Sequence, residues 1–211
     1  MTSAHGGGAA RAAKRVMDSV LAGVALIALS PLLLVVAIGI RLTMGSPVFY
    51  RQTRPGHLGR PFQIFKFRSM LPEIDRDGQR RPVNERVTRL GRQLRRTSID
   101  ELPELWNVLV GDMSLVGPRP LLMEYLPRYS LEQNRRHLVK PGLTGLAQVK
   151  GRHLVSWDDR FALDVWYVDH WSLALDLRIL RATMALVLKG HGVPDPTAEG
   201  YEFMGLGPKE S

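Results

Sequence analysis

Two adjacent carboxylates, Asp100 and Glu101, lie in the stretch RRTSIDELPELWN and have the residue types for phosphoryl transfer. An Asp carboxylate acts as a nucleophile toward phosphorus through an acyl-phosphate intermediate. Its neighbour is suited to Mg²⁺, which prefers one or two carboxylates together with substrate phosphates. Arg95 and Arg96 lie one to two turns upstream, where their guanidinium groups would bind phosphate oxygens. A helix that begins at Asp100 would add the positive end of its dipole to this anion site.

The same residues also fit a purely structural role. Ser98 and Glu101 have the spacing of an S-x-x-E capping box, and acidic residues stabilise the first turn of a helix. The pair alone therefore leaves helix capping and phosphoryl transfer both open.

Several predicted elements must position these residues. Residues 48–67 are rich in β-formers around a Gly/Pro turn and predict a β-hairpin that carries Lys66. By strand alternation alone, Lys66 could equally face solvent. The remaining expectations are a polar loop over 70–87, helices over 88–96, 100–110 and 121–138, a turn at KPGLTG, a short strand at LAQVKGR, and two helices over 157–189. In the last of these, residues 172–189 are amphipathic and predict a helix that either seats on a bilayer or packs into the core.

An uncharged segment from Ser19 to Ile40 is long enough to cross a bilayer, but Ser30 and Pro31 lie in its middle. Basic residues flank it on both sides, and positive residues mark the cytoplasmic side of a membrane. A single crossing cannot place both flanks on that side. The pattern therefore favours a helix that enters the membrane, breaks at Ser30–Pro31 and returns, over a spanning anchor or a cleaved signal peptide.

Composition points to anionic partners. The 211 residues carry a net charge of +9, and the chain has no cysteine for a disulfide or a thiolate metal site. The stretch from Arg41 to Arg96 holds fourteen Lys and Arg residues against four Asp and Glu residues. Such an excess fits anionic lipid or phosphorylated substrates, and it leaves a membrane-anchored nucleic-acid binder as a rival. A Mg²⁺-dependent phosphohydrolase would use the same carboxylates with water as acceptor.

Several ordered motifs resemble one family over most of the chain. The run DELPELWNVLVGDMSLVGPRPL (100–121) resembles the signature of the bacterial sugar transferases called monotopic phosphoglycosyltransferases. Further similar motifs are FKFRSM (65–70), KPGLTGLAQVKGR (140–152) and LDVWYVDHWSLALDLRIL (163–180). Together they span roughly residues 14–192, in the manner of a small member without added transmembrane helices.

The resemblance implies an activity and a set of site residues. Such enzymes transfer a sugar-1-phosphate from a UDP-sugar to polyprenyl (undecaprenyl) phosphate with Mg²⁺, and so begin glycoconjugate or polysaccharide assembly. Asp100 matches the nucleophile that forms an aspartyl-phosphosugar intermediate, and Glu101 matches its metal-associated partner. Four further positions match residues of the active site or the nucleotide-phosphate region: Lys66, Arg95, Arg119 and Asp164. Ser30 and Pro31 match the break of a re-entrant helix.

The expected architecture is an α+β fold with a re-entrant membrane helix, a β-hairpin and several surface-lying amphipathic helices. Its expected divisions are a disordered N-terminus (1–13), the membrane helix-break-helix (14–42), the catalytic domain (43–192) and a C-terminal tail (193–211). The resemblance implies a monotopic protein of the bacterial inner membrane, with its catalytic domain on the cytoplasmic face. Its partners would be a UDP-sugar, polyprenyl phosphate and membrane lipids, without nucleic acid. The transferred sugar, the polyprenol length, the pathway and the oligomeric state stay open.

Overall fold

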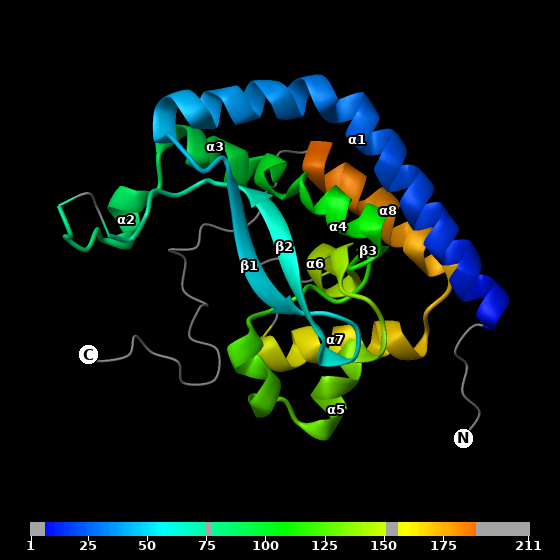
Figure 1. Ribbon diagram of the computed structural model, residues 1–211. Coiled ribbons are helices and arrows are strands. Elements are labelled where there is room, and N and C mark those ends of the chain that lie inside the picture. The colour runs from blue at the N-terminus through cyan, green and yellow to red at the C-terminus, as the bar shows by residue number, and fades with distance from the viewer. Residues whose placement is uncertain (1–6, 75–76, 151–155, 189–211) are drawn as a thin grey trace.

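A computed structural model describes residues 7–74, 77–150 and 156–188 of the chain (Figure 1). One long helix, α1 (Gly8–Met44), arches over a body of short helices and two small sheets. The strands are β1 (Phe49–Pro55), β2 (Pro61–Phe67), β3 (Ser114–Val116) and β4 (Gly142–Thr144). The other α-helices are α2 (Val83–Arg86), α3 (Arg89–Arg96), α4 (Glu104–Val110), α5 (Leu131–Asn134), α6 (Leu146–Lys150), α7 (Trp157–Asp169) and α8 (Leu173–Leu188). Four 3-10 helices complete this part of the chain: η1 (His57–Gly59), η2 (Ile99–Glu101), η3 (Met123–Arg128) and η4 (Arg135–Leu138).

Helix α1 runs without interruption through Ser30 and Pro31. Proline has no N–H to donate to the carbonyl four residues earlier, which here belongs to Ile27. The Ser30 hydroxyl donates to that carbonyl instead, at 2.8 Å. The helix bends as it passes over the body (Figure 1). The predicted break at Ser30–Pro31 is therefore not an end of the helix, because Ser30 replaces the hydrogen bond that Pro31 removes.

Both ends of α1 are tied to the same body. Near its start, the Arg15 guanidinium donates to the carbonyls of Val108 and Leu109 at the end of α4, at 2.6 and 2.8 Å. At its other end, Arg68 follows β2 and donates to the carbonyl of Gly45, at 2.7 Å, and to that of Met44. Cations near a helix C-terminus satisfy carbonyls that have no partner within the helix. Arg15, one of the basic residues that flank the uncharged segment, thus also has a packing role.

A second contact at the start of α1 is buried and ionic. Lys14 lies 2.6 Å from the carboxylate of Asp176 on α8, which also accepts from Tyr167 and Trp171. Asp176 is fully buried, so these donors replace the water that its charge loses on folding. The start of α1 is therefore fixed to both α4 and α8.

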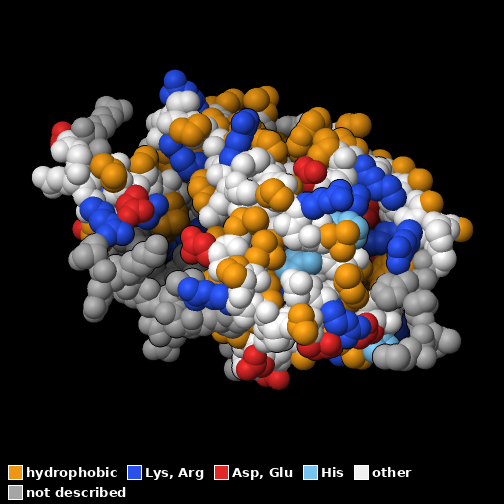
Figure 2. Space-filling view, turned by 60° about the horizontal axis from the view of Figure 1, so that its bottom comes forward, with side chains coloured by type: hydrophobic (Ala, Val, Ile, Leu, Met, Phe, Trp, Pro, Cys, Tyr) orange, Lys and Arg blue, Asp and Glu red, His pale blue; other side chains and the backbone are white. Residues whose placement is uncertain are grey.

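Much of the apolar surface of α1 faces outward. Ala22, Val36 and Ile40 are buried against the body, whereas ten large apolar side chains of this helix are exposed. They are Val16, Val20, Leu21, Val24, Ile27, Leu32, Leu34, Val35, Ile38 and Leu42. Figure 2 shows hydrophobic side chains along the rim of the molecule that α1 forms. The helix is long and apolar enough to cross a membrane, and about 1.5 Å per residue makes it roughly 55 Å long.

The predicted hairpin is confirmed. Strands β1 and β2 pair antiparallel from Phe49–Phe67 to Pro55–Pro61. Phe67 packs with Val36, Ile40 and Leu94, so this end of the hairpin lies under the second half of α1.

A second sheet brings two of the quoted motifs together. Strand β3 pairs parallel with β4, and the Gly117 N–H donates to the Thr144 carbonyl at 2.9 Å. A Cβ atom on Gly117 would lie 2.4 Å from the Lys140 carbonyl oxygen, so only glycine allows this approach. The prediction at LAQVKGR is wrong: the strand lies earlier, within KPGLTG, and Leu146–Lys150 forms helix α6.

The predicted helices are largely present, but several boundaries differ. The helix over 88–96 and the two helices over 157–189 are confirmed as α3, α7 and α8. The helix expected over 100–110 begins at Glu104. Residues 121–138 form three short helices, with an extended backbone at Tyr129 and Ser130 between the first two. On α8, Leu177 and Met184 are exposed while Ile179 is buried, so the helix presents an apolar face outward and another to the core.

The mixed helix-and-strand class is confirmed. Residues 8–13, expected to be disordered, belong to α1. Residues 1–6 and the tail from 189 lie outside the described residues.

Candidate active site

Asp100 and Glu101 do not cap a helix. Ser98 adopts a left-handed backbone (φ 57°), and its side chain makes no capping hydrogen bond. The capping-box interpretation is therefore wrong. The left-handed backbone at Ser98 changes the direction of the chain between α3 and η2. In η2, Asp100 and Glu101 are each only 8% exposed. A non-glycine residue in this conformation costs about 1–3 kcal/mol, and such strain tends to gather at functional sites.

Glu101 accepts hydrogen bonds from two cations. Lys66 Nζ lies 2.7 Å from Glu101 Oε1, and the Arg119 guanidinium donates to both carboxylate oxygens, 3.3 Å from Oε2. Burial opposes the charged form of Glu101, but Arg119 and Lys66 outweigh it and hold its pKa well below the usual range. Glu101 is therefore a fixed anion that orders two cations. The three residues that the resemblance assigned to the site thus lie in contact with one another.

Lys66 is placed by the contact between β2 and α4. The buried Asn107 side chain accepts from the Phe65 N–H at 3.0 Å and donates to the Gln63 carbonyl at 2.7 Å. These two bonds satisfy backbone groups on the edge of β2 that no strand pairs with, on either side of residue 64. They fix the strand against α4. Lys66 consequently faces the carboxylates, and the solvent-facing alternative is wrong.

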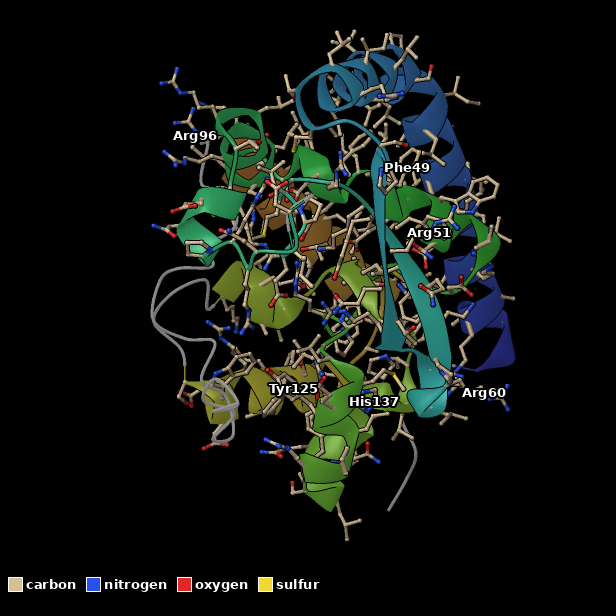
Figure 3. All side chains as sticks on the ribbon, turned by 60° about the vertical axis from the view of Figure 1, so that its left-hand side comes forward. Phe49, Arg51, Arg60, Arg96, Tyr125 and His137 are labelled. Carbon is tan, nitrogen blue, oxygen red and sulfur yellow. The ribbon has the colours of Figure 1, made fainter. Side chains whose placement is uncertain are left out.

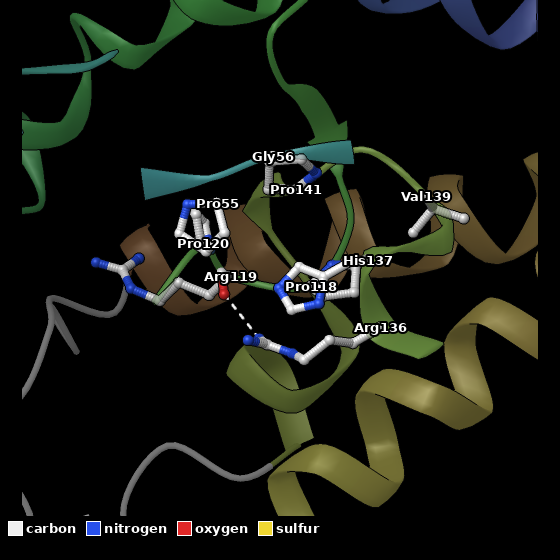
Figure 4. A pocket seen from close by; sticks show the side chains of 9 residues that line it. All are labelled: Pro55, Gly56, Pro118, Arg119, Pro120, Arg136, His137, Val139 and Pro141. Atoms are coloured by element: carbon white, nitrogen blue, oxygen red, sulfur yellow. Dashed lines mark hydrogen bonds between the residues drawn. The ribbon is translucent and has the colours of Figure 1, made fainter. Parts of the chain in front are cut away.

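Arg119 is held from behind by a buried ion pair. Arg136 donates to the Arg119 carbonyl at 2.7 Å (Figure 4), and to the Asp164 carboxylate at 2.7 and 3.1 Å. Burial raises the pKa of Asp164 and Arg136 opposes that change. The sequence assigned Asp164 to substrate binding. In the structure it instead binds Arg136, which in turn holds the backbone carbonyl of Arg119.

A small pocket lies beside this backbone. It is lined by Pro55, Gly56, Pro118, Arg119, Pro120, Arg136, His137, Val139 and Pro141 (Figure 4). Burial and the neighbouring Arg136 lower the pKa of His137 to about 4, so this lining imidazole is neutral at physiological pH.

Asp100 differs from its neighbour in having an oxygen without a partner. Among the described residues, no group donates a hydrogen bond to its buried Oδ1 atom. Burial and the charge of Glu101 raise the pKa of Asp100 to about 6, opposed by Lys66, Arg95 and Arg119. Arg95, which also contacts the Met70 sulfur at 3.5 Å, therefore acts on Asp100 electrostatically. The site combines one carboxylate with a free oxygen, one tied carboxylate and three cations.

This arrangement does not fit Glu101 as a direct Mg²⁺ ligand. Both of its oxygens accept from Arg119, and one also accepts from Lys66, so a metal bound there would face two positive side chains. The described residues contain no group of three or more His, Asp or Glu side chains placed to hold a metal. The expected need for Mg²⁺ stays a prediction, and no step below depends on it.

Sequence reasoning missed three residues that support the site, Glu104, Asn107 and Arg136, and also Arg68, which ties the end of α1 to the body. Glu104 and Asn107 follow Glu101 at intervals of three residues, which is a signal for one shared helical face. Arg68 follows Lys66 by two residues, as side chains on one face of a strand do. Arg136 had no such signal, because its partner Asp164 is 28 residues away.

Comparison with known proteins gives a consistent result. The sequence model of the family described as bacterial sugar transferase matches residues 9–190. The sugar transferase EpsL of Bacillus subtilis is 51% identical over 195 residues, which cover 91% of this chain and 96% of that protein. The UDP-glucose:undecaprenyl-phosphate glucose-1-phosphate transferases of Caulobacter vibrioides and Xanthomonas campestris are 45% and 44% identical, each over 83% of this chain. The chain spans 69% of the Caulobacter protein and 39% of the Xanthomonas protein.

The family match thus covers the long helix, the hairpin, the carboxylate pair and the supporting residues of α7 together. It extends over nearly all of the residues that the structure describes, and the identity is high along the same span. The chain therefore belongs to the bacterial sugar transferase family and is a transferase.

Proposed function

We propose that the chain transfers a sugar-1-phosphate from a UDP-sugar to polyprenyl phosphate. The names of two relatives, both UDP-glucose:undecaprenyl-phosphate glucose-1-phosphate transferases, support this donor and this acceptor. The product is a sugar linked to a lipid carrier through a diphosphate. Such a product is a starting point for building a glycan on the membrane, so the reaction stands first in that assembly.

The observation that carries the proposal is the contrast between the two adjacent carboxylates. Glu101 is tied by Lys66 and Arg119, whereas Asp100 keeps a buried oxygen with no hydrogen-bond donor among the described residues. A nucleophile needs a free lone pair, and a carboxylate stripped of water is more reactive than a solvated one. Asp100 is therefore assigned to attack and Glu101 to ordering the cations.

The proposed first half-reaction forms a covalent enzyme intermediate. A carboxylate oxygen of Asp100 attacks the phosphorus bonded to the sugar, and the bond between that phosphorus and the bridging oxygen of the diphosphate breaks. UMP leaves with the electron pair of the broken bond. The enzyme then carries the sugar phosphate as an acyl phosphate on Asp100.

The proposed second half-reaction returns the enzyme to its starting state. A phosphate oxygen of polyprenyl phosphate attacks the same phosphorus, and the acyl-phosphate bond breaks toward Asp100. The lipid leaves as a polyprenyl diphosphate sugar. Because one product leaves before the second substrate reacts, this sequence predicts ping-pong kinetics.

Both steps bring an anion to an anionic phosphate, so the site must offset that repulsion. Lys66, Arg95 and Arg119 all act on Asp100 electrostatically, and Lys66 and Arg119 are held in place by Glu101. Cations fixed beforehand cost no reorganisation when the charge develops on the transferring group. The chain itself thus supplies three positive charges to the phosphoryl group.

The arrangement of α1 supports a monotopic seat on the cytoplasmic face of the inner membrane. A helix that crossed a bilayer would carry one end away from the catalytic body. Here Arg15 and Arg68 fix the two ends of α1 to that body, and the helix exposes apolar side chains between them. Arg89, Arg92 and Arg96 are exposed on α3 below the second half of α1, and Arg96 projects outward (Figure 3). Such arginines suit anionic lipid headgroups.

This seating predicts that both ends of α1 face the cytoplasm. Because the chain has no cysteine, single cysteines at Ser3 and Ser46 can report on each end. We expect a membrane-impermeant thiol reagent to label neither position in intact bacteria and both after permeabilisation. Replacing Ser30 and Pro31 with Ala and Leu removes the bend and should shift part of the population to a spanning form. Labelling of Ser3 but not Ser46 in intact cells would contradict the monotopic seat.

The activity itself predicts UMP release that needs a lipid acceptor for multiple turnovers. The assay mixes the detergent-purified protein with a panel of UDP-sugars, with and without polyprenyl phosphate. We expect at most one UMP per enzyme without lipid and sustained release with it. Sustained release without lipid would instead indicate a hydrolase. Absence of release from every UDP-sugar would overturn the proposal.

A further inference from the structure

Glu104 is a buried acid in the first turn of α4 to which the proposed reaction gives no role. Its side chain is 2% exposed, and its Oε1 atom lies 3.0 Å from Lys66 Nζ. No donor among the residues that the structure describes makes a hydrogen bond to that Oε1 atom, so its contact with Lys66 is an ion pair. Glu104 therefore forms an ion pair with the ammonium group of Lys66.

Lys66 lies between two carboxylates. Its Nζ atom is 2.7 Å from Glu101 Oε1 and 3.0 Å from Glu104 Oε1. The backbone of β2 on either side of Lys66 is fixed by Asn107, which comes from the same helix as Glu104. One short segment, from η2 to α4, thus holds both the strand and the charged tip of its lysine.

Stability does not explain this buried charge. A carboxylate taken out of water loses several kcal/mol of hydration, and a buried ion pair often contributes less than an apolar contact of the same size. The charges that face Glu104 are Lys66, Glu101 and Arg119. Burial raises the pKa of Glu104, and so does Glu101, while Lys66 and Arg119 oppose them. An acid in this setting is costly, which points to a role in the reaction.

We propose that Glu104 is a positioning residue: together with Glu101 it clamps the Lys66 ammonium so that its charge faces the phosphorus that Asp100 attacks. The inference rests on the proposed function, because it assigns Lys66 to the transferring phosphoryl group. If Glu101 were its only contact, the four-carbon side chain of Lys66 could change rotamer and move its charge. Two carboxylates within 3.0 Å of its Nζ atom restrict that movement.

The experiment measures the first half-reaction alone. Wild type and variants are mixed with saturating UDP-sugar in the absence of polyprenyl phosphate, and the rate of UMP release in a single turnover is recorded. Glu104→Gln keeps a polar oxygen beside Lys66, whereas Glu104→Leu removes it at similar volume. Glu85→Gln on α2, at an exposed acid, is the matched control. Thermal midpoints of all variants report on the fold.

We expect Glu104→Leu to slow UMP release at least tenfold at an unchanged thermal midpoint, and Glu104→Gln to stay within about threefold of wild type. The control should match wild type. Rescue by glutamine separates positioning from general packing, since leucine fills the same space. Should Glu104→Leu fail to fold, Glu104→Ala removes the acceptor with no added apolar volume, and the same tenfold loss is expected.

Two outcomes would overturn the clamp. Release by Glu104→Leu at the wild-type rate would mean that Lys66 needs no second acceptor. Equal loss in the glutamine and leucine variants would assign the effect to the carboxylate charge itself. Failure of the proposed function looks different, because the wild type would then release no UMP in the single turnover.

Discussion

Replacing Asp100 with Asn is expected to reduce UMP release with polyprenyl phosphate by roughly 10³-fold or more, because a neutral amide cannot replace the carboxylate that attacks the phosphorus. The substitution keeps the size of the side chain. It also removes a buried charge, and burial is the main cause that raises the pKa of Asp100. The variant should therefore fold as wild type does, with an unchanged thermal midpoint. Steady-state UMP release is the measurement.

The control for this variant is chemical. Asn reverts to Asp by deamidation, and a trace of reverted enzyme would imitate residual activity. Intact-protein mass and a second variant, Asp100→Ala, exclude that source. Full turnover by Asp100→Asn, free of deamidation, would leave Asp100 without a role in the reaction and would exclude the covalent mechanism.

Glu101→Gln is expected to lower the maximal rate by about 10²-fold or more. Glutamine can accept from one cation, but it lacks the charge that holds Lys66 and Arg119 together on one carboxylate. Removing one partner of a buried charge pair leaves the other charge uncompensated, at a cost of about 3–5 kcal/mol. The two cations would then lose their fixed positions beside Asp100. The measurement is the maximal rate at saturating UDP-sugar and lipid.

The same variant tests whether Glu101 holds the two cations in place or binds Mg²⁺ directly. If Glu101 orders the cations, the Mg²⁺ concentration that gives half-maximal rate should be the same in Glu101→Gln and in wild type, within about threefold. A direct ligand predicts a different result, since even residues that only support metal ligands alter metal affinity by about 10–100-fold. A rise of tenfold or more in the required Mg²⁺ would therefore contradict the anchoring role.

Local patterns predicted the elements that carry the site. The aromatic and β-branched runs around a Gly/Pro turn correctly predicted the hairpin, and the basic helix over 88–96 begins where Thr88 caps it. The placement of Lys66, Glu101 and Arg119 in one cluster came from the resemblance, because the spacing of residues 66, 101 and 119 carries no such information. The structure supplies the physical reason: Asn107 fixes β2 to α4, and the β3–β4 pair brings Arg119 back.

Other features depend on contacts between distant residues and were outside the reach of local patterns. Pro31 predicts a break in any isolated helix, but the Ser30 hydroxyl and the anchors at both ends keep α1 continuous. Ser98 and Glu101 have the spacing of a capping box, yet the left-handed backbone at Ser98 directs Glu101 to Lys66 and Arg119 instead. Asp164 was predicted to bind substrate, and its partner Arg136 could be found only in three dimensions.

The most direct test of the account is the intact mass of the wild-type protein after mixing with a UDP-sugar in the absence of polyprenyl phosphate. Attack by Asp100 predicts a mass increase of one sugar phosphate, which is lost on addition of polyprenyl phosphate and is absent from Asp100→Asn. The adduct should map to the peptide that contains Asp100. An unchanged mass under conditions in which the same preparation turns over with lipid would contradict the covalent mechanism and favour direct attack by the lipid phosphate.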